Sequence, residues 1–587
     1  MVNIEKKWRG VALFALFFGL GSCVDSKYDL DKDIDWTITV GGDYLTVPVG
    51  TTDTIFLSKI IDLEKDGMLG VDGNHEYHLT KKGVIEVEPT SVSKVQIAQV
   101  VTEMTPIVVV DEVKNNAFSF LSGENVSAEV HTSGALETNV TGIDEALKEL
   151  GKITASEPSL LTLTFEFEKG EGIEYDKVLA DGLTFVFPDF IQFEPGQELL
   201  RGNSLVLPKG YVMSSDGSSN HVELKVTGYK FNDKAGTAEA MKPVNGELLI
   251  SGVIQAEGRV LTTGVVKGGM LSMTPKAVLA PMEINRVVGV IQPEITVEDT
   301  QIALTGLPDF LKDESTRLDI SNPVFLFKAE NSLNTEVVLD AVLTPEREGK
   351  DLSANQVVVN GLKLAPASEG ETFIALSRTG VSGVSGASDT QVEDINKLIE
   401  VIPDFINVEL KPRVENNQFY GAELGIDYEL PSSYDVDVPL CFESNLNIVY
   451  QDSITELNKD LADLDKVDFR VANFIFTAVN TVPLQLEAKP ENVEIKDRDG
   501  KVIDNIKVEN NGRHIAESKD GKEKVESEFT LKLTSKEPNV LSRIDCITFK
   551  VTAVPGQATN VPLKDEQWLK MTKIRLNVPG GIKVDLN

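Results

Sequence analysis

Apolar and polar residues alternate along much of the chain, which is the pattern of β-strands that have one buried and one solvated face. The segment 161–168 (LTLTFEFE) alternates without interruption, and Leu183, Phe185 and Phe187 continue the same two-residue period. From residue 43 onward this pattern dominates. The chain is therefore predicted to consist mainly of strands.

Dipeptides of Asp or Asn followed by Gly separate many of these strands, and both residues tolerate the positive φ that tight hairpin turns require. They occur at 72–73, 216–217, 245–246, 360–361, 499–500 and 520–521. Helical periodicity is limited to three short stretches, 141–150, 389–401 and 454–464. We therefore expect an all-β protein with several consecutive β-sandwich-like domains and a few short helices.

Two internal repeats bear on the domain organisation. An apolar-Pro-Asp-Phe element recurs at 187–190, 307–310 and 402–405, and its Pro and Asp favour a turn at a domain edge. The segment 325–333 (FLFKAENSL) is similar to 474–482 (FIFTAVNTV). This second repeat indicates two related sandwich starts, with a chance match between strands as the alternative.

The length of 587 residues predicts several domains, since one domain usually has about 100–200 residues. A Ser/Gly-rich linker loop is expected at 377–388, inside the third β domain. The expected segments are a signal peptide at 1–22, an acidic tether at 23–42, a β domain at 43–150, and sandwich-like domains at 151–285, 286–465 and 466–587.

The N-terminal residues carry a secretory signal, because basic residues at 6–9 precede an apolar run at 11–20 that is too short to span a bilayer. The end of this run resembles the lipobox of bacterial lipoproteins. The box consists of Leu20, Gly21, Ser22 and Cys23. The resemblance implies cleavage before Cys23 and a membrane partner bound through acyl chains on that cysteine. The alternative is a plain signal peptide with an accidental cysteine.

The residues after Cys23 form a short, charged segment that we expect to be a solvated tether. Asp29, Asp31, Asp33 and Asp35 alternate as in calcium loops, but the Gly and Glu that such a loop needs are missing. An acidic segment at this place resembles the surface-export signal of Bacteroidetes lipoproteins. It implies a lipid-anchored protein of the outer membrane that faces the cell surface, with the periplasmic face as the alternative.

The chain has a formal charge of −36, from 56 Lys+Arg and 92 Asp+Glu, and this charge limits the kinds of partner that it can bind. Such a surface repels phosphate backbones, so nucleic acid is excluded. Three cysteines and five histidines exclude a disulfide scaffold and leave little material for metal or acid–base chemistry.

Several segments together resemble a group of large, uncharacterised surface lipoproteins of gut Bacteroidetes. They are the lipobox, the tether residues 28–31, the segments 38–43 and 51–55, and the segments 434–440 and 478–484. The resemblance implies an envelope location and a multi-domain β architecture. It implies no functional residue, because that group has no established activity.

No catalytic motif is visible, so no catalytic residue and no cofactor are predicted. Ser382 and Ser385 lack the second glycine spacing of a nucleophile elbow. His75 and His78 are three residues apart, which places them on opposite faces of a strand and disfavours a metal pair. Cys441 and Cys546 could form a disulfide in an oxidising envelope or be two buried small apolar residues.

These observations favour a non-enzymatic surface binding or structural module. The first alternative is an accessory glycan-binding lipoprotein of a nutrient-uptake system, although Trp36 and Trp568 are the only tryptophans after Cys23. The second is an anchor or tip component of a surface appendage. The expected partner is an envelope protein or a glycan.

We expect Cys23→Ser to abolish lipidation, because the acyl-acceptor thiol is lost. The measurement is incorporation of labelled palmitate together with partition into the detergent phase. A Cys23→Ser protein that still incorporates palmitate and partitions with detergent would disprove the lipoprotein assignment.

Overall fold

The computed structural model describes residues 37–585 except for 41–42, 52, 62, 64–66, 112–123, 216–217, 237–240, 266–268, 381–385, 455–466, 469, 538–539 and 581. The predicted signal peptide, the lipobox with Cys23 and most of the tether lie outside the described residues. Part of the predicted linker loop and nearly all of the third predicted helix lie outside them as well.

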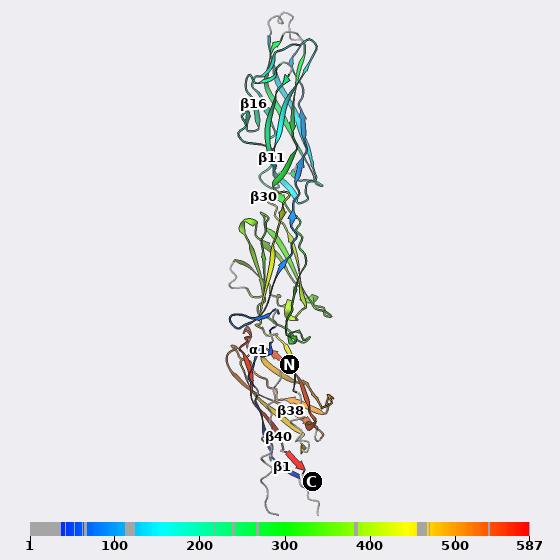
Figure 1. The fold of residues 1–587 in the computed structure, drawn as a ribbon, viewed down its shortest axis with the longest axis vertical. Helices are drawn as coiled ribbons and strands as arrows, with labels where there is room; N and C mark the ends of the chain where they lie inside the picture. Colours follow the sequence, from blue (N-terminus) through cyan, green and yellow to red (C-terminus); the bar gives the residue numbers. More distant parts are fainter. Residues whose placement is uncertain are drawn as a thin grey trace, which may run out of the picture.

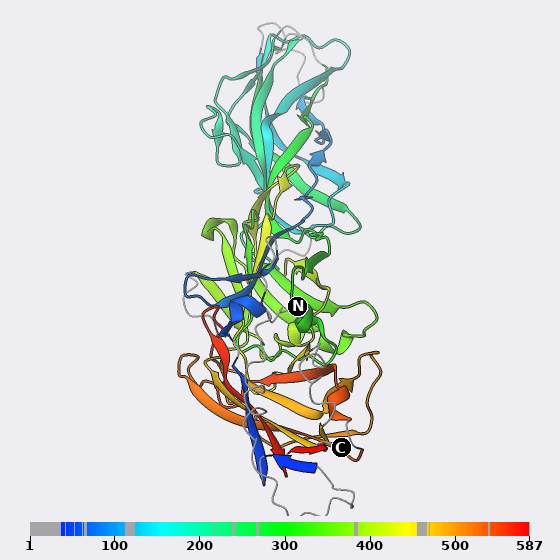
Figure 2. The same ribbon diagram turned by 60° about the horizontal axis from the view of Figure 1, so that its bottom comes forward.

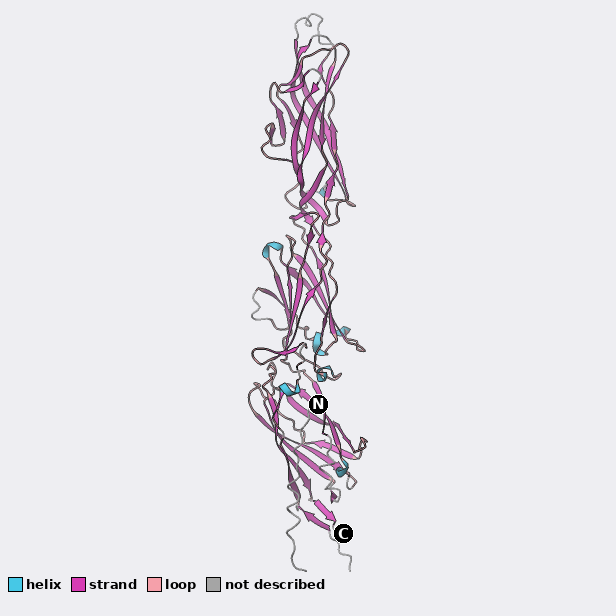
Figure 3. Ribbon diagram, viewed as in Figure 1, coloured by secondary structure: helices cyan, strands magenta, loops and turns pink. Residues whose placement is uncertain are grey.

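Three β-sandwiches lie end to end, so the molecule is a rod (Figure 1). By their places in Figure 1 we name them the upper domain (92–291 and 420–423), the central domain (67–91, 292–419 and 424–447) and the lower domain (37–61 and 448–585). Strands fill all three (Figure 3). The predicted all-β class is confirmed.

The upper domain packs two antiparallel sheets face to face. One contains β10 (Glu124–Thr141), β12 (Lys177–Ala180), β13 (Leu183–Val186), β15 (Leu200–Arg201), β16 (Ser204–Leu207), β17 (Val212–Ser215), β18 (Ser218–Ser219) and β20 (Glu247–Val265). The other contains β7 (Val95–Ile97), β8 (Val100–Glu103), β9 (Ile107–Val110), β11 (Leu147–Lys169), β14 (Ile191–Phe193), β19 (His221–Lys230), β21 (Leu271–Leu279), β22 (Met282–Ile291) and β30 (Tyr420–Glu423). The alternating segment 161–168 lies in β11, as predicted.

The central domain has a six-stranded and a four-stranded sheet. The first contains β4 (Leu69–Val71), β5 (Tyr77–Ile85), β24 (Val324–Ala329), β27 (Thr372–Ser377), β28 (Ala387–Gln391) and β32 (Ser432–Pro439). The second contains β23 (Thr300–Ala303), β25 (Val337–Glu346), β26 (Val357–Leu364) and β29 (Phe405–Arg413). A short pair, β6 (Thr90–Ser91) with β31 (Asp427–Tyr428), leads toward the upper domain.

The lower domain also has two facing sheets, with a small third sheet at its end. The larger contains β2 (Tyr44–Gly50), β3 (Ile55–Phe56), β35 (Val471–Asn480), β37 (Ile506–Asn510), β38 (Val525–Ser535) and β40 (Trp568–Pro579). The facing sheet contains β33 (Ile448–Ile454), β36 (Gln485–Lys496) and β39 (Cys546–Val554), and the third contains β1 (Thr37–Val40), β34 (Val467–Asp468) and β41 (Ile582–Asp585).

The chain runs up the rod once and returns, so the domains are nested rather than consecutive. The outgoing leg supplies β2, β5 and β7, and the returning leg supplies their antiparallel partners β40, β32 and β22. Figure 2 shows the blue N-terminal strands of the lower domain beside its red C-terminal strands. The four consecutive segments predicted from the sequence are therefore wrong as domains. Residues 43–150 alone contribute strands to all three.

The central and lower domains share one topology, and each is interrupted after its first few strands, β4–β6 in the central domain and β1–β3 in the lower domain. The order β27-β24-β32-β5 in the central domain corresponds to β38-β35-β40-β2 in the lower domain. On the facing sheets, β23-β29-β25 corresponds to β33-β39-β36. The predicted relation between 325–333 and 474–482 falls on the matching strands β24 and β35, which supports two related sandwich starts.

A buried asparagine ends the repeated segment in both domains. The Asn331 side chain accepts from the Leu333 N–H (3.0 Å) and donates to the carbonyls of Thr335 and Ala365 (2.8 and 2.9 Å). Asn480 likewise accepts from the N–H two residues later and donates to the carbonyl four residues later (2.9 and 3.0 Å). Each amide therefore satisfies backbone groups that burial would leave without partners.

Of the predicted turns and helices, some are confirmed by the structure and others are wrong. The turn at Asn245-Gly246 is confirmed, since both residues have positive φ (53° and 74°). The helix predicted at 141–150 is wrong, because β10 ends at Thr141, β11 begins at Leu147, and the Asp144 carboxylate holds the connection by accepting from the Ala146 N–H (2.9 Å). Tertiary strand pairing has overridden a local helical pattern there.

Helices are short in the part of the chain that the structure describes. They are α1 (Leu57–Ile60), α2 (Lys397–Glu400) and the 3₁₀ turns η5 (Asp309–Lys312), η6 (Ser353–Asn355), η7 (Ala367–Glu369) and η9 (Leu541–Arg543). The helix predicted at 389–401 is thus reduced to one turn after β28. Within the described ranges, none of these helices has the length and apolar character needed to cross a bilayer.

We expect the upper domain to fold without the other two domains, since residues 92–292 lack only its four-residue strand β30. We expect the central domain to need its outgoing strand. The fragment 92–292 should give a strand-type circular dichroism spectrum and cooperative urea unfolding. The fragment 297–445 should not unfold cooperatively, because β5 buries Tyr77 and Leu79 in its core. Adding a peptide of residues 68–91 should restore cooperative unfolding.

The control is the same peptide with Leu79→Asp, which places a charge in the core and should not restore folding. Cooperative unfolding of 297–445 without any peptide would contradict the nested topology.

Candidate functional site

Backbone hydrogen bonds between three segments that are distant in the sequence join the central and lower domains. The Tyr77 N–H donates to the Leu563 carbonyl (3.0 Å), and the Leu563 N–H donates to the Leu440 carbonyl (2.9 Å). The Leu440 N–H in turn donates to the Tyr77 carbonyl (2.8 Å). All three residues are buried. We call this contact the junction. Because buried backbone N–H and C=O groups need hydrogen-bond partners, these bonds join the two sandwiches firmly.

The β4–β5 turn brings charged and imidazole side chains to the junction. One oxygen of the Asp72 carboxylate accepts from the N–H groups of Asn74 and Glu76 (both 2.8 Å), and the other accepts from the Asn74 side chain (3.1 Å). His75 adopts a left-handed conformation (φ 63°). The carboxylate thus builds the turn around itself, as in other Asx turns.

A second turn in the lower domain has the same hydrogen bonds. The Asp497 carboxylate accepts from the N–H groups of Asp499 and Lys501 (both 3.0 Å), and Gly500 has a φ of 74°. His75 therefore occupies the position that Gly500 has in the second turn. A non-glycine residue there costs roughly 1 kcal/mol of backbone strain.

Two side-chain contacts of this turn cross the junction. His75 Nδ1 lies 3.1 Å from an oxygen of Asp565, and Lys564 Nζ lies 2.9 Å from an oxygen of Glu76. The Lys564 ammonium is mostly buried (19% exposed), whereas His75 is open to solvent (62% exposed). The lysine contact is therefore less screened than the histidine contact.

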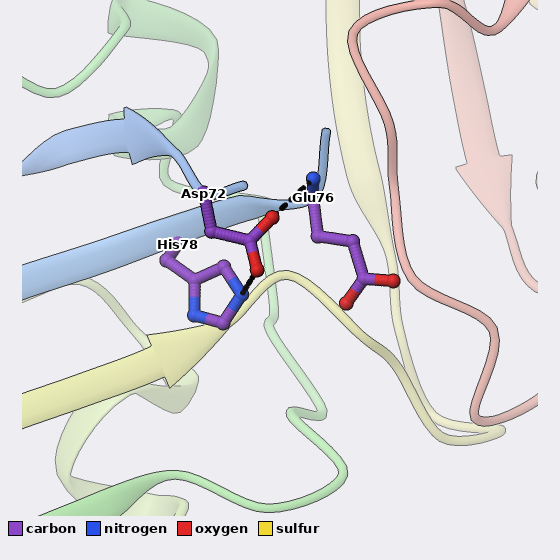
Figure 4. A group of neighbouring side chains, drawn as sticks. All are labelled: Asp72, Glu76 and His78. Carbon is purple, nitrogen blue, oxygen red and sulfur yellow. Dashed lines mark hydrogen bonds and ion pairs between the residues drawn. The ribbon is translucent and has the colours of Figure 1, made fainter. Parts of the chain in front are cut away.

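Asp72, Glu76 and His78 form a cluster on the central-domain side of the junction, with ligand-type atoms within 4.8 Å of one another (Figure 4). His78 Nδ1 bonds to Asp437 on the neighbouring strand β32 (2.7 Å), and His78 Nε2 points at the Asp72 carboxylate at 4.0 Å. His78 Nε2 is buried and has no hydrogen-bond partner among the residues that the structure describes. Figure 4 shows the Glu76 carboxylate turned away from the imidazole.

The carboxylates around His78 favour its charged form. The hydrogen bond to Asp437 raises the pKa of His78 most, burial opposes this, and the nearby charges of Asp437, Asp72 and Glu76 raise the pKa further. The pKa of Asp72 is lowered, chiefly because its carboxylate accepts the Glu76 N–H. The site therefore holds a concentrated negative charge beside one imidazole.

The structure places His75 in the β4–β5 turn and only His78 on the strand β5, so the expectation of opposite faces of one strand does not apply to this pair. His75 turns to the lower domain and His78 packs against β32. The sequence reasoning missed the cluster itself, although the spacing Asp72-x₃-Glu76-x-His78 around an Asp-Gly turn is legible in the chain. No sequence pattern could indicate that Asp437 contacts His78, because the two residues are 359 positions apart.

The two described cysteines are both free thiols, so the disulfide alternative is wrong for Cys441 and Cys546. Cys441 is buried at the junction, where its Sγ contacts Asn560 (3.4 Å) and Ser321 (3.8 Å). Burial raises the pKa of the Cys441 thiol. Cys441 is thus a small packing residue at the junction, as the second alternative held.

Aromatic side chains give little support to a sugar platform in the described part of the chain. Trp568 is half-buried at the start of β40, with Lys524 Nζ 5.6 Å from its ring centre. The large exposed apolar residues include only two aromatics, Tyr44 and Phe56. Trp36 lies outside the described residues.

Comparisons with known proteins complete this description. No protein-family model and no curated protein matches the chain. A solved structure of a "putative secreted protein" from Parabacteroides distasonis is 15% identical, covers 51% of this chain and 83% of its own, and has a TM-score of 0.36. The Faustovirus major capsid protein is 7% identical, covers 91% of this chain and 92% of its own, and has a TM-score of 0.07. At these scores neither likeness defines a family.

We expect His75→Ala to destabilise the junction more than His75→Gly does. Both changes remove the contact to Asp565, but only alanine keeps the strain of the left-handed backbone, roughly 1 kcal/mol. Urea unfolding of the full chain measures the difference. At the control position Asn74, where φ is not positive, alanine should be no worse than glycine. Equal stability of the two His75 variants would contradict this account.

Proposed function

We propose that the chain is a non-enzymatic structural or binding module of the cell envelope, in which the rod carries its upper domain away from an anchored lower end. The observation that supports this is the nested topology. The described ends of the chain meet at the lower end, where Thr37 pairs with Asp585. The upper domain is the part farthest from both ends (Figure 1).

The interior of the rod suits a spacer. One buried apolar cluster runs through the upper and central domains and reaches Leu563 of the lower domain, and a second cluster fills the lower sandwich. A hollow inside the upper sandwich is lined only by apolar side chains, among them Val95, Leu150 and Leu248. Such a hollow is part of the core, because a ligand pocket needs polar groups that orient its ligand. The proposal assigns no catalytic residue.

The anchor in this proposal is Cys23, acylated after cleavage of the signal peptide. The tether is shorter than the predicted segment 23–42, because Thr37–Val40 form β1 of the lower domain. The protein then belongs to the outer membrane and faces the cell surface. Outward-facing sheets provide area for an envelope protein or glycan partner, and the charge of −36 keeps nucleic acid away. Support for the anchor comes from the lipobox residues alone.

We expect external protease to degrade the chain on intact cells while a periplasmic marker stays whole, since the rod projects outward. Immunoblotting of shaved cells measures this, and cells lysed before shaving are the control. A chain that is protected until lysis would contradict a surface location.

The same proposal predicts no turnover by the purified chain on a panel of polysaccharides and peptides. Hydrolysis needs a positioned nucleophile or acid–base pair, which the proposal does not assign. Reproducible turnover that is abolished by changing one carboxylate would refute the non-enzyme assignment. Saturable glycan binding that Trp568→Ala abolishes would favour the glycan-binding alternative.

A further inference from the structure

The His78 imidazole is arranged as metal-ligating histidines are. Its Nδ1 bonds to the Asp437 carboxylate at 2.7 Å, which orients the ring and leaves Nε2 to face the turn. A carboxylate behind the ring is the usual outer partner of a histidine ligand. Among the residues that the structure describes, Nε2 has no hydrogen-bond partner although it is buried, and it points toward the Asp72 carboxylate.

The separation between His78 Nε2 and the Asp72 carboxylate is too long for a direct hydrogen bond but near that of two ligands of one metal ion. His78 Nε2 and Asp72 Oδ2 are 4.0 Å apart, which exceeds a hydrogen bond. A tetrahedral metal ion about 2.1 Å from each ligand atom holds the two atoms roughly 3.4 Å apart. His78 Nε2 and Asp72 Oδ2 would have to approach each other by about 0.6 Å to bind one such ion.

Asp72 keeps acceptor capacity for such an ion. Its Oδ1 is used by the N–H groups of Asn74 and Glu76, and its Oδ2 accepts only from the Asn74 side chain at a longer distance of 3.1 Å. Each carboxylate oxygen can accept two bonds, so one position on Oδ2 remains and faces His78.

Glu76 is the third candidate ligand, and Lys564 competes for it. The Lys564 ammonium holds one oxygen of Glu76 at 2.9 Å, and the second oxygen is free to turn toward the cluster. Rotation of the Glu76 side chain toward His78 would complete the set, because one ligand atom from each of the three residues already lies within 4.8 Å of the others.

We propose that Asp72, Glu76 and His78 bind a divalent transition-metal ion of the Zn²⁺ type at the junction, with water in the remaining positions and Asp437 as the group that orients His78. One imidazole and two carboxylates are N/O ligands that suit Zn²⁺ and Co²⁺, whereas Ca²⁺ prefers oxygen alone. The ion ties the β4–β5 turn to the imidazole that β32 holds. The site does not depend on the proposed envelope role.

The test is calorimetric titration of the purified, metal-free full-length chain with ZnCl₂. We expect one equivalent to bind, and both His78→Gln and Asp72→Asn to weaken binding at least tenfold. Asp72→Asn keeps the turn, since asparagine also forms Asx turns. Asp437→Asn should weaken binding about 10- to 100-fold through the orienting bond. The control is His221→Gln, because His221 also lies near a carboxylate (Glu223, 3.7 Å) but outside the cluster.

Visible absorption of the Co²⁺-loaded wild type provides a readout that needs no variant, and Zn²⁺ should displace the signal. Far-ultraviolet circular dichroism verifies that each variant is folded. The absence of a 1:1 Zn²⁺ isotherm, equal affinity in folded His78→Gln, or tighter binding of Ca²⁺ than of Zn²⁺ would each overturn the proposal.

Discussion

Antiparallel pairing between the outgoing and the returning leg of the chain is the interaction on which the whole rod depends. In the central domain β5 lies between β4 and β32, and it buries Tyr77 and Leu79 almost completely. Without that strand, β32 would be an open edge and the core would lose two large apolar side chains. The same argument applies to β2 beside β40. The paired strands are far apart in the sequence, but this costs little additional conformational entropy, because the entropy of loop closure grows only logarithmically with loop length.

The nesting also decides where the junction between domains forms. The chain crosses from the lower to the central domain on the way out and again on the return, so two crossings lie side by side there. Tyr77 at the start of β5 and Leu440 directly after β32 belong to the outgoing and the returning leg, and Leu563 of the lower domain bonds with both. Exposed ion pairs contribute little, typically under about 1 kcal/mol. The buried backbone bonds therefore hold the junction, and the contacts of His75 and Glu76 adjust its orientation.

The sequence predicted the β class because alternation and Asp/Asn-Gly turns are local, and β11 and the turn at 245–246 followed those signals. It did not predict the nesting, since nothing in the pattern of β5 indicates that its partner is β32. The similarity of 325–333 and 474–482 was informative because it reflects a shared topology ending in a buried asparagine. For the site, Asp72, Glu76 and His78 were within reach of spacing arguments, whereas Asp437 was not, because strand register alone brings it to His78.

The turns at 72–76 and 497–501 have the same backbone hydrogen bonds but different neighbouring side chains, so a comparison shows which properties come from the neighbours. At 72–76 and at 497–501 an aspartate accepts the N–H groups two and four residues later, so the same hydrogen bonds build both turns. The second oxygen of Asp497 faces the Arg543 guanidinium at 3.7 Å, which supplies a permanent positive charge. The second oxygen of Asp72 faces His78 Nε2, whose charge depends on what it binds. The turn itself therefore confers no special chemistry. The distinctive property of the junction arises because β5 places an imidazole, backed by Asp437, where the lower domain places an arginine.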